Sequence, residues 1–130
     1  MNASNYQPAD LRLLTHIGYL AMKMKWAEEG EAIFSALIEV VQSKAELYFT
    51  WLVARCELND MSGASELLAR LQKIEAPADM LLMARCYVEC CSDRPEWIAT
   101  AKKIVQSGPG TFGYETACSM LDQQKLHSLA

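Results

Sequence analysis

The sequence is poor in residues that interrupt helices. Among its 130 residues are 6 glycines and 4 prolines, and apolar residues recur between these breaks at spacings of three and four. Such spacing is typical of a helix that buries one face. It predicts, for example, a buried face on the first helix made of Leu11, Leu14, Ile17, Leu20 and Met24. No segment is a convincing strand, so an all-α fold is predicted.

Concentrated charge and long apolar runs are also missing. The chain has 12 basic and 16 acidic residues, a net charge of −4, and its longest basic run is Lys102-Lys103. Because nucleic-acid binding needs a concentrated basic face, no nucleic-acid partner is expected. No uncharged run approaches the roughly 20 residues of a membrane span. The segment Met1–Asp10 lacks the features of a secretory signal, and a cytoplasmic protein without a membrane span is predicted.

The chain offers little for catalysis. Its only histidines, His16 and His127, do not lie in a motif with the Ser, Cys or Asp partners of nucleophilic catalysis. The segment Gly108-Pro109-Gly110 lacks the lysine and hydroxyl residue of a phosphate-binding loop. We therefore predict no catalytic residues and no cofactor, and a protein that is not an enzyme.

The cysteines are odd in number and unevenly spread. A disulfide scaffold usually distributes an even number over loops, whereas three here fall within six residues of a predicted helix. They are Cys56, Cys86, Cys90, Cys91 and Cys118. Buried free thiols are expected, and no metal, since zinc sites usually use Cys-x-x-Cys pairs on turns. A small enzyme or metal-dependent regulator that uses this cluster is the alternative of a different class.

Helix breakers divide the chain into seven predicted helices within one domain, 1–130. Short turns between helices of this length are typical of antiparallel hairpins. The predicted hairpins span about 11–42, 44–74 and 77–106, and a terminal helix spans 111–127. Ser43 with Glu46 predicts a capping box, Asp60 an N-cap, and Pro77 the first position of a helix.

An internal repeat accompanies these hairpins. A shift of 34 residues places Ile17 on Trp51, and Gly30 on Ala64. The small residues predict a close approach of two helices. Between the second and third hairpins the offset is instead 30, which aligns Ala54-Arg55-Cys56 with Ala84-Arg85-Cys86.

A 34-residue helix–turn–helix period resembles the tetratricopeptide repeat. This resemblance implies three stacked antiparallel helical hairpins of tetratricopeptide-repeat type plus a C-terminal capping helix. A plain helical bundle is the alternative.

A narrower resemblance concerns the first two hairpins. Leu13–Leu20 together with Trp26–Leu37 is similar to the first repeat of chaperones of bacterial type III secretion systems, and Val53–Asp60 is similar to their second. The resemblance implies a virulence-associated, cytoplasmic bacterial chaperone that sequesters an amphipathic helix of a secreted needle subunit, with a small co-chaperone as an additional partner. A related small export partner and a translocator chaperone are the alternatives within this group. A structural adaptor or homodimerising module is the alternative outside it.

Such folds hold their client in a groove lined by the first helix of each hairpin, a form of helix-in-groove recognition. Residues of the first helices that the hairpin core does not require would line it, and core packing is the alternative for each. The implied groove residues are Tyr19, Met22, Phe49, Val53, Cys56, Met83, Cys86, Tyr87 and Cys90. An empty apolar groove of this kind would also favour a homodimer when no client is bound.

Overall fold

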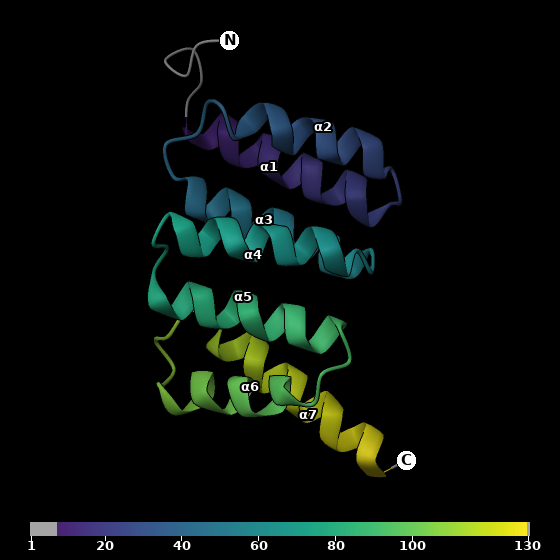
Figure 1. Cartoon of the computed structure of the whole chain (residues 1–130), viewed down its shortest axis with the longest axis vertical. Coiled ribbons are helices and arrows are strands. Elements are labelled where there is room, and N and C mark those ends of the chain that lie inside the picture. Colours follow the sequence, from purple (N-terminus) through teal and green to yellow (C-terminus); the bar gives the residue numbers. More distant parts are fainter. Residues whose placement is uncertain (1–7, 130) are drawn as a thin grey trace. The chain divides into compact units, whose positions relative to one another are not determined.

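A computed structural model describes residues 8–129, which form seven α-helices and no strand (Figure 1). The helices are α1 (Pro8–Lys23), α2 (Ala27–Leu37), α3 (Lys44–Glu57), α4 (Met61–Lys73), α5 (Ala78–Cys91), α6 (Glu96–Gln106) and α7 (Tyr114–Leu129). The prediction of an all-α fold is confirmed. Most of the segment predicted to lack a secretory signal lies outside the described residues.

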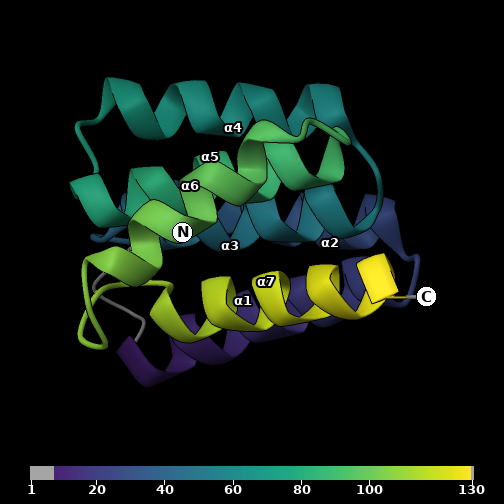
Figure 2. The same ribbon diagram turned by 90° about the horizontal axis from the view of Figure 1, so that it is seen from below.

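The chain divides into two compact units, the first ending at Ile74 and the second beginning at Glu75. In the first unit α1 pairs with α2, α3 pairs with α4, and α1 also packs against α3. In the second unit α5 pairs with α6, and α7 packs against α6. The last turns of α7 extend past the end of the α5–α6 hairpin (Figure 1 and Figure 2). The single domain predicted over 1–130 stays a prediction.

The first helix of each hairpin ends in the same kind of turn. A residue with positive φ stands two places beyond the helix, and the following N–H bonds back to the carbonyl five residues earlier, as in a Schellman C-cap. The positive-φ residues are Lys25 (68°), Asn59 (61°) and Asp93 (56°). The bonds run from Trp26 to Ala21 (2.8 Å), from Asp60 to Arg55 (2.9 Å) and from Arg94 to Glu89 (2.9 Å).

These turns recur every 34 residues, from 25 to 59 and from 59 to 93. The helix ends recur likewise, at Lys23, Glu57 and Cys91. The 30-residue offset predicted between the second and third hairpins is therefore wrong. In the observed register Cys56 corresponds to Cys90, because helix ends and turn geometry set the register and the repeated Ala-Arg-Cys does not.

Two small residues lie in tightly packed places, as predicted. A Cβ on Gly30 would overlap the Met22 side chain and lie 3.0 Å from the Gly18 carbonyl oxygen, so α2 approaches α1 closely at this point. Ala64, the corresponding residue of the second hairpin, is fully buried.

The helix starts match the predictions in part. The Asp60 carboxylate accepts a hydrogen bond from the Gly63 N–H at 3.0 Å, which confirms this N-cap. The Ser43 side chain makes no cap hydrogen bond, so the predicted capping box is wrong. Since Ser43 and Lys44 are exposed, water can bond the first N–H groups of α3 instead. Pro77 is the N-cap of α5, one position earlier than predicted.

Candidate functional site

The nine predicted groove residues fall into two groups by burial. Four are half-buried: Tyr19, Phe49, Tyr87 and Cys90. Five are buried, with exposed fractions of 0 to 9%: Met22, Val53, Cys56, Met83 and Cys86. A buried side chain cannot contact a client while its surroundings stay packed, so core packing is favoured for these five. Contact of any of the nine with a client stays a prediction.

Tyr19 has a defined role within the first unit. Its hydroxyl donates to the Glu57 carboxylate, with distances of 2.7 and 2.9 Å to the two oxygens, and the Lys23 ammonium lies 6.0 Å from the centre of its ring. Because Glu57 is at the end of α3, this hydrogen bond fastens α1 to α3.

The most exposed apolar surface of the first unit lies on α1, and three of its four residues were predicted to be buried. Four large side chains are exposed along this helix: Leu13 (59%), Ile17 (43%), Leu20 (43%) and Met24 (60%). At 3.6 residues per turn they fall within an arc of roughly 60°, and the hydrogen bond from the Met24 N–H to the Leu20 carbonyl continues the helical turn. We call these four residues the α1 stripe. The buried-face prediction is wrong for Ile17, Leu20 and Met24.

The corresponding face of α3 shows why the prediction failed. Residues 34 positions after Leu13, Ile17 and Leu20 are Leu47, Trp51 and Ala54, and all three are buried. Trp51 stacks on Phe34 of α2, with ring centroids 5.5 Å apart and planes 9° apart. The preceding hairpin thus covers this face of α3, and no described helix precedes α1 to cover the α1 stripe. The 34-residue repeat is the sequence signal that could have predicted the exposure of the α1 stripe, because it shows which face of each first helix the preceding hairpin covers.

A half-buried polar network joins the two hairpins of the first unit. Arg55 donates from Nε and Nη2 to the Glu31 carboxylate at 3.1 and 2.6 Å, and from Nη1 to the Gly63 carbonyl at 2.9 Å. The Trp51 indole N–H donates to the same carboxylate at 2.7 Å. Burial alone would raise the pKa of Glu31, but the hydrogen bonds from Arg55 and Trp51 and the Arg55 charge lower it below its ordinary value. These contacts serve to stabilise the fold.

Two cysteines of the second unit have raised pKa values. Burial, with smaller contributions from Cys90 and Glu89, raises the pKa of Cys86 to about 12, and its Sγ lies 3.7 Å from the Trp97 carbonyl oxygen. Burial also raises the pKa of Cys90. Within the part of the chain that the structure describes, no three His, Cys, Asp or Glu side chains are grouped so as to hold a metal ion.

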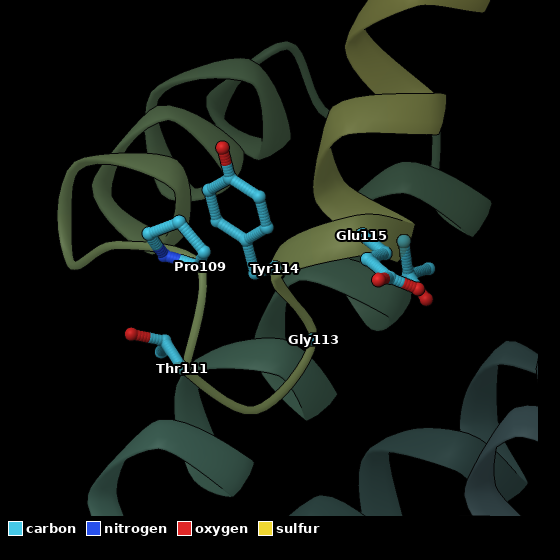
Figure 3. Close-up of a pocket in the computed structure, with 6 residues that line it drawn as sticks. Pro109, Thr111, Gly113, Tyr114 and Glu115 are labelled. Carbon is cyan, nitrogen blue, oxygen red and sulfur yellow. The ribbon is translucent and has the colours of Figure 1, made fainter.

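An open hollow of about 260 Å³ lies where the loop after α6 enters α7 (Figure 3). It is lined by Pro109, Thr111, Gly113, Tyr114, Glu115 and Thr116. A hydrogen bond with Cys118 raises the pKa of Tyr114 above its ordinary value of 10.0. The lining of this hollow contains no histidine and no cysteine. The His127 side chain lies outside the described residues.

Among the described helices, none is both long and apolar enough to cross a membrane. Comparisons with protein-family models, with curated proteins and with solved structures find no match for this chain. The feature of the described residues that indicates a function is the α1 stripe, because its large apolar side chains are exposed.

Proposed function

We propose that this chain is a non-enzymatic protein-binding module that covers an amphipathic helix of a client protein. The observation that carries the proposal is the α1 stripe, whose four large apolar side chains are all more than 40% exposed. A contiguous apolar strip on one helix face is the surface that a second amphipathic helix buries when it docks.

The repeat class proposed for the module is the tetratricopeptide type. The 34-residue recurrence of helix ends and left-handed turns supports it, as does the tight packing at Gly30. In such arrays each hairpin buries its apolar face on its neighbour. The exposed apolar face of α1 therefore favours a partner on it.

For the client, we propose a secreted subunit of a bacterial type III secretion system, with the needle subunit ahead of the translocators. The resemblance of Leu13–Leu20 and Val53–Asp60 to those chaperones supports this choice. Such a protein acts in the cytoplasm, because it must bind the client helix before export. A structural adaptor that homodimerises through the α1 stripe is the second candidate, and the same exposed side chains favour it.

Panning a displayed library of helical peptides on the protein tests the proposal. We expect enriched clones to carry apolar residues at spacings of three and four. Replacing Ile17 and Leu20 together by Ser should weaken their binding at least tenfold, or about 1.4 kcal/mol. The matched control is Ile74→Ser with Leu126→Ser, which removes two exposed apolar side chains elsewhere (43% and 67%).

A further pair of substitutions separates the α1 stripe from the implied groove. If Phe49→Ala and Tyr87→Ala abolish binding with a normal thermal melt, and the Ile17 and Leu20 variant still binds, the client occupies the groove. If no clone is enriched and the protein forms a dimer that the Ile17 and Leu20 variant lacks, the adaptor candidate replaces the chaperone.

A further inference from the structure

A basic edge runs along one side of the α1 stripe. Arg12, His16 and Lys23 are all exposed, and helical periodicity places them within roughly 40° of one another, next to the stripe. On the opposite side of the stripe lie the exposed Asp10, the half-buried Leu14 and the buried Ala21. Basic residues are therefore gathered on one side of the apolar surface only.

This edge is peculiar to the hairpin whose apolar face is uncovered. The residues 34 positions later, on α3, are Glu46, Thr50 and Glu57, and the chain as a whole carries a net charge of −4. A cationic edge on an acidic protein favours partners of opposite charge and repels those of like charge.

The contact between α2 and α3 is an example, within the same unit, of how such a face is covered. The covering helix α2 contributes an aromatic ring, Phe34, which stacks on Trp51. One turn earlier it contributes a carboxylate, Glu31, which pairs with Arg55 of the covered helix. At this contact an apolar stack is thus accompanied by a carboxylate that pairs with a cation of the covered helix.

We infer that the α1 stripe and its basic edge bind an amphipathic helix that carries Asp or Glu along one flank of its apolar face. This inference rests on the proposed function and specifies the chemistry of the partner. The apolar residues of the partner helix cover Ile17 and Leu20, and its carboxylates face Arg12 and Lys23. The basic edge sets which helix is accepted, while the stripe supplies the contact area.

Charge also opposes an antiparallel pairing with a second copy of the chain. An antiparallel pairing of two α1 helices through the stripe sets one basic edge against the other, and like charges facing each other oppose association. An anionic membrane would attract the edge but is repelled by the net negative charge of the protein. Glu28 and Glu29, exposed at the start of α2, add to that repulsion.

The test uses the full chain and two synthetic helical peptides that share the same leucines at spacings of three and four. One peptide carries Glu along the flank and the other carries Lys. By fluorescence anisotropy we expect the Glu peptide to bind about tenfold more tightly at low salt, with an advantage that shrinks as salt screens the charges. Arg12→Glu with Lys23→Glu should reverse the preference. Lys102→Glu with Lys103→Glu, the same change of charge on α6, should leave it intact.

The possible failures are distinguishable. Equal affinity for both peptides, lost in the Ile17→Ser and Leu20→Ser variant, overturns the acidic partner alone and leaves the proposed function standing. Failure of both peptides to bind removes the α1 site and the proposed function with it. Peptide binding that is unchanged in this variant overturns the α1 site alone and assigns the client to another surface. A stripe-dependent dimer in sedimentation assigns the surface to a second copy. Binding to phosphatidylserine vesicles that requires Arg12 and Lys23, without a peptide preference, assigns the edge to lipid.

Discussion

The Glu31 carboxylate on α2 and the Arg55 guanidinium on α3 form a two-point ion pair, with N–O distances of 2.6 and 3.1 Å. The pair crosses from the first hairpin to the second. The third bond of Arg55, to the Gly63 carbonyl, extends the connection to α4. The guanidinium also lies 4.6 Å from the centre of the Trp51 ring. One cation therefore holds three helices of the first unit together.

Removal of this cation should destabilise the fold. Arg55→Met leaves the Glu31 carboxylate and the Gly63 carbonyl without their bonds to Arg55, and we expect a loss of about 2–3 kcal/mol in the free energy of unfolding. Urea denaturation measures it. The control is Arg70→Met, because the Arg70–Glu66 pair is equally short at 2.6 Å but exposed and should contribute at most ~0.5 kcal/mol. Equal losses would show that burial of the Arg55 pair is without effect.

The same pair predicts how stability depends on pH. The folded-state pKa of Glu31 is lowered from its ordinary value of 4.5, so its ionic contribution is complete above about pH 6 and is lost as pH falls through the folded pKa. We expect the difference in unfolding free energy between wild type and Glu31→Gln to shrink between about pH 6 and pH 3. A difference that stays constant across this range would contradict the lowered pKa.

The close approach of α1 and α2 predicts that the first hairpin does not tolerate a methyl group at Gly30. A Cβ there meets the Met22 side chain and backbone and the Gly18 carbonyl, so Gly30→Ala should cost about 1–2 kcal/mol even though Ala favours helix. Thermal melts measure the effect. Gly110→Ala is the control, since nothing lies within 4 Å of its added Cβ, and its melting temperature should be unchanged. A melting temperature of Gly30→Ala equal to that of the wild type would contradict the close contact of Gly30 with α1.

Burial of Cys86 predicts slow alkylation. Raising its pKa from 9.0 to about 12 lowers the thiolate fraction near neutral pH by about a thousandfold. Mass mapping after treatment with iodoacetamide should show label at the half-buried Cys118 well before Cys86. In guanidinium the two should react at similar rates. Early labelling of Cys86 in the folded protein would overturn its place in the core.

The helices could be predicted from sequence because their signals are local. The spacing of apolar residues predicted the number of helices. Asp60 predicted the start of α4, because its carboxylate accepts a hydrogen bond from a backbone N–H three residues away. Lys25 did not predict the end of α1, because it adopts a left-handed conformation that glycine usually adopts at this position. The turn around it is closed by backbone hydrogen bonds from Lys25 to Met22 and from Trp26 to Ala21, which any residue except proline at position 25 could make.

The candidate site was harder to predict, because apolar spacing on a helix is the same whether or not another helix covers it. Ile17 and Trp51 occupy equivalent positions, yet Ile17 is 43% exposed and Trp51 is 4% exposed. What separates them is that α2 covers Trp51, whereas no described helix covers Ile17. Residues such as Met22 fill space within a hairpin, and no sequence pattern distinguished them from residues that would line a groove.

The pairing of neighbouring helices also bears on how the chain reaches its structure. α1 pairs with α2, α3 with α4, and α5 with α6, so each of these contacts closes a loop of only a few residues. Closing short loops costs little chain entropy, and helical proteins with local contacts fold in roughly microseconds to milliseconds. Each hairpin can act as a starting point for its neighbours. Each hairpin should accordingly form fast, and contacts between hairpins, such as the one from Tyr19 to Glu57, can follow.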